Sequence, residues 1–337
     1  MSAMYHETFL ERLRLGAAGL VHEWGLSGNT SVQLLEISEN ATFRADDPDA
    51  AETVVLRVHR PGYRTVAEIE SELAWIQALR ADGIVNTPKP LECSGGGHIA
   101  TFPTEEGLRE VVAFEFMSGR QPSAADDLVQ GFHELGALSA RLHGHARNWV
   151  RPPGFTRKSW NFATTIGDTP LWGDWRAGLG LSTEGRRVLE QTAGYLEAII
   201  AEYGTDPNRF GLIHADLRLA NLLVDGERIA VIDFDDCGFG WFGFDFAAAV
   251  SFIEEDPRIP ELMASWVDGY RTVAPMAEAD RAMLPVFVML RRLQLTAWVA
   301  SHSETPTAQS MGVAFTEGTV RLAREFLSRM IVGERRA

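Results

Sequence analysis

The chain has 337 residues, of which 45% are hydrophobic and 23% are charged, and its formal net charge at pH 7 is −15. This length exceeds what one hydrophobic core usually supports, so we expect two domains or lobes. The acidic balance argues against nucleic acid or an anionic membrane as the main partner. It suits a cationic substrate, although acidic surfaces usually serve only solubility.

The sequence shows no membrane or secretory segment. It contains no run of eighteen or more apolar residues, so we expect no transmembrane helix. The first residues, MSAMYHETFLERLRLG, lack the basic start and the apolar core of a signal peptide, and the cytoplasm is the expected compartment. Cys93 and Cys237 are too few for a disulfide framework and too isolated for a zinc site. We interpret Cys237 as a small buried residue, with modification beside the acidic motif as the alternative.

The first part of the chain predicts short strands. A helix is expected over residues 12–24, and two β-like runs follow over Ser31–Ile37 and Ala41–Arg44. The polar tripeptide Ser38-Glu39-Asn40 between these runs predicts a hairpin. A further strand is expected over Thr53–Pro61, TVVLRVHRP, because the run is apolar and β-branched and Pro61 ends it.

A helix and more strands complete this part. Helical spacing predicts a helix over residues 65–82, with four apolar side chains on one face: Ile69, Leu73, Ile76 and Leu79. Residues 91–102, broken by Gly95-Gly96-Gly97, predict another hairpin. Val111–Met117 is an apolar strand that Ser118-Gly119 closes.

The rest of the chain predicts mainly helices. Helical periodicity covers residues 126–145, 183–204, 259–273, 280–302 and 312–332. A tryptophan-rich segment over 149–175 predicts either a lid over a substrate or a loop packed on the helices. Together these patterns predict an α+β fold, with a β-rich part over residues 1–119 and a mainly helical part over 120–337.

The chemistry concentrates in LIHADLRLANLLVDGERIAVIDFDD, residues 212–236. Strands are expected over Leu222–Val224 and Ile229–Phe234, and the turn Asp225-Gly226 would fold them into a hairpin. Such a hairpin would bring Asn221 near Asp233 and leave Asp216 close by. Phosphoryl transfer needs a carboxylate for the attacking hydroxyl and hard oxygen ligands for Mg²⁺. Individually these acids are ordinary turn residues, but their order and spacing favour a kinase.

This pattern, H-x-D-x-x-x-x-N followed by I-D-F, resembles the catalytic loop and metal motif of the protein-kinase fold. The form HADLRLANLLV…VIDFDD is similar to the aminoglycoside phosphotransferase and choline kinase superfamily, and the paired acids resemble those of stress-response kinase A and homoserine kinase-like members. The resemblance spans nearly the whole chain. It implies a two-lobe kinase-like fold with a β-sheet N-terminal nucleotide-binding lobe and a helical C-terminal lobe for catalysis and the acceptor.

The resemblance also implies roles for single residues. Asp216 would be the catalytic base, and Asn221 and Asp233 would be the Mg²⁺ ligands. His214 would brace the loop, and Asp245, in GFDFAAA, would steady it from a later helix. Two extra carboxylates would touch a second metal or a cationic substrate: Asp235 and Asp236.

The nucleotide site departs from the kinase pattern. A cation on the third strand usually contacts the ATP phosphates and pairs with a glutamate of the next helix. Arg57 occupies this position instead of lysine, with Glu72 as its expected partner; the alternative is a strand arginine that faces water. Ser38 and Asn40 stand in the phosphate-covering turn, where no glycine-rich loop occurs. The resemblance implies a hinge at Phe114–Met117, with the backbone of Glu115 to Met117 reading adenine.

Three other signals are set aside. Gly238–Gly243 spells G-x-G-x-x-G, but its aromatic residues would crowd a pyrophosphate and no second βαβ strand follows, so we do not expect a dinucleotide site. Arg291 and Arg292 lie on a late helix, and we interpret them as solvated charges. His302 near them is either structural or part of an acceptor pocket.

The sequence therefore predicts an ATP- and Mg²⁺-dependent phosphotransferase whose acceptor is a hydroxyl of a small molecule, such as an amino alcohol, homoserine or an aminoglycoside. The absence of a recognisable activation loop favours a small molecule. A protein Ser/Thr kinase of the stress-response type is the enzymatic alternative. A nucleotide-binding pseudokinase is the alternative from another class, favoured only by Arg57. No oligomeric state is predicted.

Overall fold

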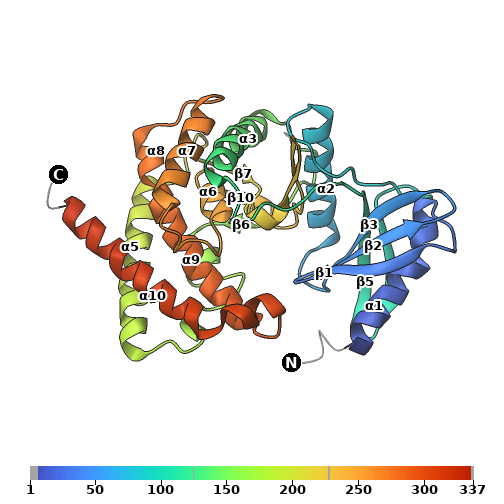
Figure 1. The fold of residues 1–337 in the computed structure, drawn as a ribbon, viewed down its shortest axis with the longest axis horizontal. Coiled ribbons are helices and arrows are strands. Elements are labelled where there is room, and N and C mark those ends of the chain that lie inside the picture. Colours follow the sequence, from blue (N-terminus) through green and yellow to red (C-terminus); the bar gives the residue numbers. More distant parts are fainter. Residues whose placement is uncertain (1–6, 124, 227, 335–337) are drawn as a thin grey trace. The chain divides into compact units, whose positions relative to one another are not determined.

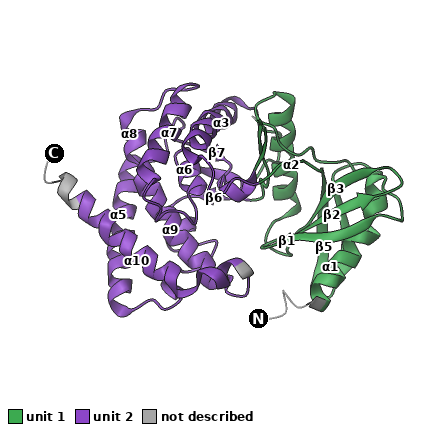
Figure 2. Cartoon of the chain, in the orientation of Figure 1, with its two compact units in different colours: residues 1–120, 150–157, 223–235 green, residues 121–149, 158–222, 236–337 purple. Residues whose placement is uncertain are grey.

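The computed structural model describes residues 7–123, 125–226 and 228–334 (Figure 1). Its contacts divide the chain into two compact units, coloured separately in Figure 2. Unit 1 comprises residues 1–120, 150–157 and 223–235, and unit 2 comprises residues 121–149, 158–222 and 236–337. The predicted division of the chain into two lobes at Gly119 stays a prediction. Unit 1 extends to residue 120, but it also includes two later segments.

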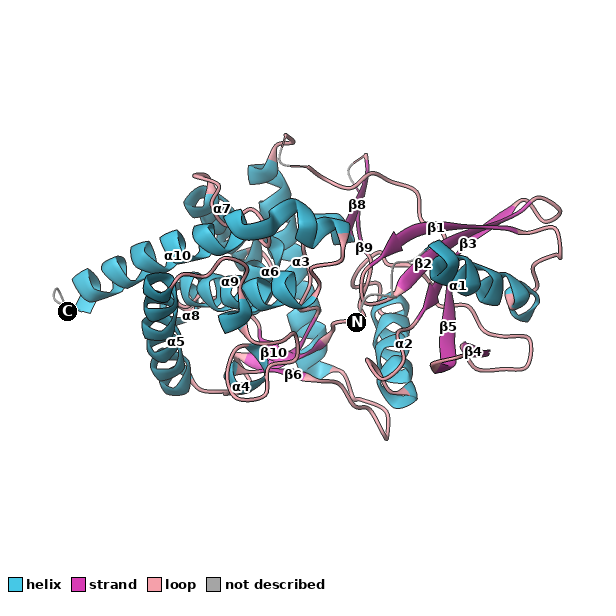
Figure 3. Cartoon of the chain, turned by 90° about the horizontal axis from the view of Figure 1, so that it is seen from below, coloured by secondary structure: helices cyan, strands magenta, loops and turns pink. Residues whose placement is uncertain are grey.

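Unit 1 is built on an antiparallel sheet with strand order β1-β2-β3-β5-β4 (Figure 3). The strands are β1 (Ser31–Ile37), β2 (Ala41–Asp47), β3 (Glu52–Val58), β4 (Ile99–Thr104) and β5 (Gly107–Glu115). The helix α1 (Glu7–Gly19) and the short 3-10 turn η1 (Val21–Trp24) share a core with the sheet, in which Leu13, Phe43 and Leu56 are buried. The predicted β1–β2 hairpin is confirmed.

The helix α2 (Val66–Ala81) follows the sheet's third strand and begins at a capping box. The Thr65 hydroxyl accepts from the Glu68 amide, and the Glu68 side chain accepts from the Thr65 amide, so two otherwise unpaired N–H groups are satisfied. The predicted apolar face is confirmed, because its four members are buried: Ile69, Leu73, Ile76 and Leu79.

The hairpin expected over residues 91–102 is wrong. Gly96 and Gly97 adopt positive φ values of 88° and 75°, and the turn they make is closed by the Cys93 amide donating to the Gly97 carbonyl at 2.8 Å. This turn precedes β4, whose partner is β5. Three consecutive glycines therefore mark a loop before the sheet edge, and the hairpin itself turns near Glu106.

Unit 1 is completed by a two-stranded hairpin of β8 (Leu222–Asp225) and β9 (Arg228–Val231), as predicted from the Asp225-Gly226 turn. The Val231 amide donates to the Asn86 carbonyl at 2.9 Å, which attaches β9 to the segment after α2. Phe234 packs edge-on against Trp75 of α2, with ring centroids 5.5 Å apart. These contacts hold the metal motif that follows β9 within unit 1.

Unit 2 is mainly helical and surrounds a small sheet of order β6-β10-β7. Its strands are β6 (Ser159–Trp160), β7 (Phe210–Ile213) and β10 (Gly238–Trp241). Its helices are α3 (Leu128–Asn148), α4 (Phe162–Thr165), α5 (Thr183–Tyr203), α6 (Phe244–Ala249), α7 (Ile259–Arg271), α8 (Glu278–Ala282), α9 (Leu284–Ser301) and α10 (Pro306–Glu334), with short 3-10 turns η2 (Trp175–Ala177) and η3 (Leu219–Asn221). The chain breaks from helical geometry inside α10 at Gly312.

The tryptophan-rich segment is a packed loop. Trp160, Trp172 and Trp175 are buried in the core of unit 2 with α9, so these side chains stabilise the helical unit instead of forming an exposed lid. Cys237 is also buried, as predicted.

The segment Glu278–Ser301, which spans α8 and α9, is long and apolar enough by composition to cross a membrane. However, 83% of its most apolar window is buried inside the structure, as in the core helix of a globular unit. The sequence predicted no transmembrane helix, and this apolar helix is buried inside the structure. Many of the residues of α9 belong to the hydrophobic core of unit 2.

Helices α3 and α7 approach closely at two glycines. A Cβ atom on Gly269 would lie 1.8 Å from the His133 carbonyl oxygen, and one on Gly136 would lie 2.0 Å from the Trp266 carbonyl oxygen. Backbone cannot yield as a flexible side chain can, so both positions require glycine.

We expect Gly269→Ala to destabilise unit 2 by about 3 kcal/mol or more, because overpacking a close helix contact displaces backbone. Gly131→Ala is the matched control in α3, where an added Cβ meets nothing within 4 Å. That variant should be neutral or gain up to about 1 kcal/mol from helix propensity. Urea unfolding of both variants tests this, and equal effects would contradict it.

Candidate active site

The predicted catalytic loop follows β7 in unit 2 and is anchored by Asp245. The Asp245 carboxylate, at the first turn of α6, accepts from the Ala215 amide at 2.8 Å and the His214 amide at 3.3 Å. Ala215 has a positive φ of 67°, a conformation that costs a non-glycine residue about 1 to 2 kcal/mol. The carboxylate holds this strained backbone, and with it the direction of Asp216.

Asp245 is itself held by a buried chain of polar groups. His143 Nε2 lies 2.9 Å from Asp245 Oδ2, and His143 Nδ1 lies 3.2 Å from the Tyr270 hydroxyl. Burial lowers the pKa of His143, and burial raises the pKa of Tyr270 to about 12. A neutral His143 that donates from Nε2 and accepts the Tyr270 proton at Nδ1 satisfies every member. This network lay outside the sequence predictions, because His143 carries no motif.

Three side chains donate hydrogen bonds to the Asp216 carboxylate. Its Oδ1 accepts from Arg291 Nη2 at 2.6 Å, and its Oδ2 accepts from Arg218 Nε at 3.1 Å and Asn221 Nδ2 at 2.7 Å. Burial acts to raise the pKa of Asp216, but the charges of Arg218 and Arg291 overcome it and hold this pKa below its ordinary value. Asp216 is therefore an ionised carboxylate, as a base for a hydroxyl must be.

The interpretation of two arginines of α9 as solvated charges is wrong. Arg291 and Arg292, expected as solvated charges, are each 2% exposed, and each pairs with an acid inside unit 2. Their partners, Asp216 and Glu254, are distant in sequence, so no local pattern signals the pairing. His302 is buried and stacks on Trp298 with ring centroids 4.9 Å apart.

Asn221 is oriented by the loop that carries the base. Its Nδ2 donates to both the backbone oxygen of Asp216, at 2.9 Å, and the Asp216 Oδ2, at 2.7 Å. These two acceptors fix the amide assignment and leave the side-chain oxygen as a hard ligand for a cation. His214 supports the same loop, since its Nδ1 accepts from the Asp216 amide at 3.3 Å.

In unit 1, Arg57 lies between two predicted site acids. Its Nη2 is 2.7 Å from both Glu72 oxygens, and its Nη1 is 3.4 Å from Asp233 Oδ1. Arg57 is 5% exposed, so the alternative of a strand arginine facing water is wrong. Burial opposes its charge, but Glu72, Asp235 and Asp233 outweigh this and raise the pKa of Arg57. The fork thus remains cationic in a position next to the metal motif.

Asp233 and Asp235 have opposite surroundings. The Asp233 side chain is 46% exposed, and its positive φ of 60° turns the chain after β9. Asp235 is buried, with Arg64 Nε 3.5 Å from its Oδ2 and His59 Nδ1 3.8 Å from its Oδ1. Burial acts to raise the pKa of Asp235, but Arg64 and Arg57 hold it far below its ordinary value.

Arg64 and Arg157 also donate to the Asp235 backbone oxygen. Burial, followed by the charge of Arg57, lowers the pKa of His59 to about 3, so His59 stays neutral there. These contacts engage Asp235 with cations of its own unit, and its predicted role toward a second metal or a substrate stays a prediction. Asp236 lies in unit 2, where its backbone oxygen accepts from Trp160 Nε1 at 2.8 Å.

The other residues predicted for the nucleotide site lie in the β1–β2 turn and at the end of β5. The Ser38 amide donates to the Asn40 carbonyl at 3.0 Å, and the Asn40 side chain accepts from the Arg60 amide at 3.2 Å, which ties the β1–β2 turn to the end of β3. The Glu115 amide donates to the Lys89 carbonyl at 2.9 Å. The Glu115 N–H is therefore already engaged by Lys89 and is not a donor for adenine. The predicted hinge role of Met117 stays a prediction.

The structure thus brings the predicted residues together in two groups. Arg57, Glu72 and Asp233 are in contact within unit 1. The second group is linked by hydrogen bonds within unit 2: His214, Asp216, Asn221 and Asp245. Joint metal binding by Asn221 and Asp233, which belong to different units, stays a prediction.

Each of the two predicted magnesium ligands carries a hard oxygen donor. Asn221 offers an amide oxygen and Asp233 a partly exposed carboxylate, the hard ligands that Mg²⁺ takes. Over residues 7–123, 125–226 and 228–334, no three His, Cys, Asp or Glu side chains gather into a metal site on their own. Such a sparse protein ligand set is usual where nucleotide phosphates complete the shell of Mg²⁺.

The glycine-rich segment after the metal motif is structural. Gly238–Trp241 forms β10, and a Cβ on Gly238 would lie 2.4 Å from the Lys158 backbone oxygen. Close strand packing therefore accounts for the glycines, in agreement with setting aside a dinucleotide site.

We expect Glu72→Gln to destabilise unit 1 by about 3 to 5 kcal/mol, because it leaves the buried Arg57 charge without its partner. The matched control is Glu105→Gln, which breaks an exposed pair with Arg12 and should cost at most about 1 kcal/mol. Chemical denaturation of both variants measures the difference. A Glu72→Gln cost as small as the control's would contradict this account.

We expect Asp245→Asn to destabilise unit 2 by about 2 to 3 kcal/mol, since hydrogen bonds to a charged acceptor are the stronger ones and the amide presents N–H groups to donors. Asp268→Asn, an exposed acid of α7, is the control and should change stability by less than about 0.5 kcal/mol. Thermal unfolding checks both. Stability unchanged in Asp245→Asn would remove Asp245 as the anchor of the loop.

Comparison with known proteins identifies the family and the fold of the chain. The model of the phosphotransferase enzyme family matches residues 32–281. The structure of a microcompartment-associated aminopropanol kinase is similar at 43% identity and a TM-score of 0.86, covering 93% of this chain and 97% of that one. An amicoumacin kinase in complex with AMP-PNP, Ca²⁺ and Ami shares the fold, at 22% identity and a TM-score of 0.74, with 94% of each chain covered.

A curated sequence relative is the amicoumacin kinase of Bacillus subtilis, 22% identical over 78% of this chain and 77% of that protein. A spectinomycin phosphotransferase and a choline/ethanolamine kinase family protein share the fold at TM-scores of 0.64 and 0.63. The predicted kinase-like α+β fold and the resemblance to this superfamily are confirmed. The chain belongs to the phosphotransferase enzyme family.

Proposed function

We propose that the chain is an ATP- and Mg²⁺-dependent kinase that transfers the γ-phosphoryl group to the hydroxyl of a small amino alcohol. The observation that carries this proposal is the buried, ionised Asp216, whose Oδ2 shares a hydrogen bond with an oriented Asn221. A carboxylate in this state accepts a proton from a hydroxyl, and the amide beside it retains an oxygen for a cation. The similarity to an aminopropanol kinase supports the amino alcohol.

Each residue has a proposed part in the transfer. Asp216 orients the acceptor hydroxyl and takes its proton as the acceptor oxygen bonds to the γ-phosphorus. The bond from that phosphorus to the oxygen bridging it to the β-phosphate breaks, and ADP leaves. Arg57, fixed by Glu72, would bring a permanent positive charge to the proximal phosphates, in the place where lysine is usual. Asn221 and Asp233 would hold Mg²⁺, which supplies positive charge against the charge that develops on the phosphoryl oxygens.

The charge of the chain also suits this acceptor. An amino alcohol carries an ammonium group at neutral pH, and the net charge of −15 attracts cations at long range. A protein hydroxyl is the competing acceptor, and turnover with a protein but with no amino alcohol would favour it.

We expect the purified chain to consume ATP with aminopropanol, and the variant Asp216→Asn to lose about 10³-fold in kcat while nucleotide affinity changes little. Loss of the base removes proton acceptance but leaves the Arg57 fork in unit 1 untouched. The assay compares aminopropanol, ethanolamine, choline, homoserine, an aminoglycoside and a generic protein substrate, with calorimetry for nucleotide binding.

Asp225→Asn is the control, because this exposed acid lies at the β8–β9 turn, and its activity should match the wild type. Wild-type turnover in Asp216→Asn would contradict the role of the base. ATP binding without turnover of any acceptor would instead indicate a pseudokinase.

A further inference from the structure

We propose that Arg291 is a positioning residue for the phosphoryl transfer: from a buried place on α9 it fixes the orientation of the Asp216 carboxylate. The inference rests on the proposed function, because it assigns a role toward the proposed base. It adds a residue that belongs to no motif in the sequence. The Arg291 Nη2 atom lies 2.6 Å from Asp216 Oδ1, closer than Asn221 Nδ2 at 2.7 Å and Arg218 Nε at 3.1 Å lie to Oδ2.

The Arg291 guanidinium is itself held in place. Its Nε donates to the Ser251 hydroxyl at 3.1 Å, and its Nη1 donates to Gln294 Oε1 at 3.2 Å. Its plane lies near two aromatic rings, with the guanidinium carbon 4.7 Å from the Trp172 centroid and 5.8 Å from that of Phe244. A planar fork with hydrogen bonds at its edge and its central carbon over two aromatic rings has little freedom to move.

The fixed Arg291 guanidinium in turn restricts the orientation of the Asp216 carboxylate. Arg291 engages Oδ1 of Asp216, whereas Asn221 and Arg218 engage Oδ2. Rotation of the carboxylate about its last bond would break contacts on both oxygens at once. Misplacing a reacting group by about 1 Å costs on the order of 10²-fold in rate, so fixing this rotation bears on kcat.

The Arg291 side of the carboxylate is also closed to an acceptor. Arg291 is 2% exposed, whereas the Arg218 side chain is 24% exposed. An acceptor hydroxyl would therefore approach Asp216 from the more exposed side of Arg218, with Arg291 behind the carboxylate.

Helix α6 connects both supports of the base. Asp245, in its first turn, holds the backbone of the catalytic loop, and Ser251, just beyond its end, holds Arg291. Phe252, the next residue, has a positive φ of 71°, so the chain after α6 takes a costly conformation where it supports Arg291. One short helix thus fixes the loop and the carboxylate.

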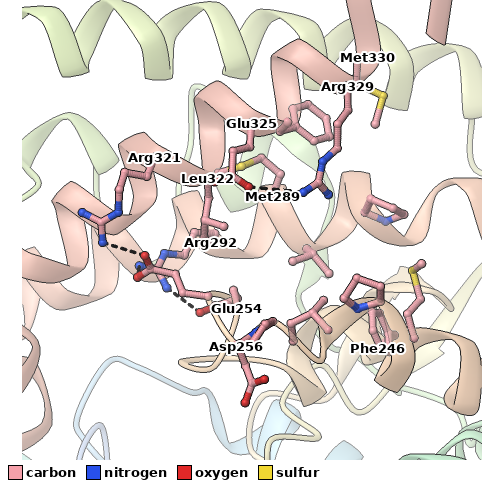
Figure 4. A pocket seen from close by; sticks show the side chains of 18 residues that line it. Phe246, Glu254, Asp256, Met289, Arg292, Arg321, Leu322, Glu325, Arg329 and Met330 are labelled. Atoms are coloured by element: carbon pink, nitrogen blue, oxygen red, sulfur yellow. Dashed lines mark hydrogen bonds and ion pairs between the residues drawn. The ribbon is translucent and has the colours of Figure 1, made fainter. Parts of the chain in front are cut away.

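Arg292 provides a matched comparison on the same helix. It is equally buried, at 2%, but it pairs with Glu254 at 2.6 Å and has no contact with Asp216 among its hydrogen bonds and ion pairs. Figure 4 shows this pair at the wall of a pocket of about 380 Å³ between the segment after α6 and helices α7, α9 and α10. Removing either arginine takes an ion-pair partner from a buried acid, but of the two only Arg291 touches the proposed base, which keeps Arg218 and Asn221 in its absence.

The test compares Arg291→Ala with Arg292→Ala in kcat, KM for ATP and aminopropanol, nucleotide affinity and thermal stability. We expect both to lose stability. Arg291→Ala should lower kcat about 100-fold with nucleotide affinity within about threefold of the wild type, whereas Arg292→Ala should keep kcat within about threefold. Guanidinium ion at low millimolar concentration should restore Arg291→Ala at least fivefold and leave Arg292→Ala unchanged.

A second variant keeps the inference testable if Arg291→Ala does not fold. Arg291→Lys retains the charge but loses the fork, and we expect about a tenfold lower kcat in a protein that unfolds near the wild-type temperature. A kcat in either Arg291 variant no lower than in Arg292→Ala would overturn the inference. Absence of turnover in the wild type would count against the proposed function instead, so the two failures are distinguishable.

Discussion

The buried carboxylate of Asp245 is the constraint on which the proposed site depends. It accepts two consecutive backbone amides, from His214 and Ala215, in a loop whose backbone would otherwise relax. The acid is held in turn by His143 and, through it, Tyr270. Because Asp216 follows directly, its backbone is positioned by buried groups of unit 2. One satisfied buried charge thus fixes the backbone of the proposed catalytic loop.

Buried arginines hold further acids in place, the proposed base among them. The chain has a net charge of −15 and thus more acidic than basic side chains. Three of its arginines are nevertheless buried against carboxylates: Arg57, Arg291 and Arg292. Buried pairs contribute little to net stability, since desolvation cancels much of the attraction. Their value lies in geometry, because a planar fork with several donors fixes both itself and its partner. Arg57 in place of lysine fits this use of arginine.

Much of this arrangement could be predicted from the sequence. The periodicity of Ile69 and Leu73 and the Asp225-Gly226 turn are local signals, and the structure follows them. The failures arose where partners are distant. Arg291 looked like a solvated charge because its acid lies 75 residues away, and the glycines after Cys93 resembled a hairpin turn without a paired strand. Joint binding of a metal by Asn221 and Asp233 remains a prediction.

The central claim is that Asp216 serves transfer of a phosphoryl group to a hydroxyl of a small molecule, and the structure of the product tests it most directly. Phosphorus NMR of a reaction of the purified chain with ATP, Mg²⁺ and aminopropanol would identify that product. The account predicts ADP and a phosphomonoester resonance coupled to the proton on the carbon that bore the hydroxyl. Inorganic phosphate as the sole new phosphorus species beside ADP, or a phosphoramidate at the amine, would contradict it.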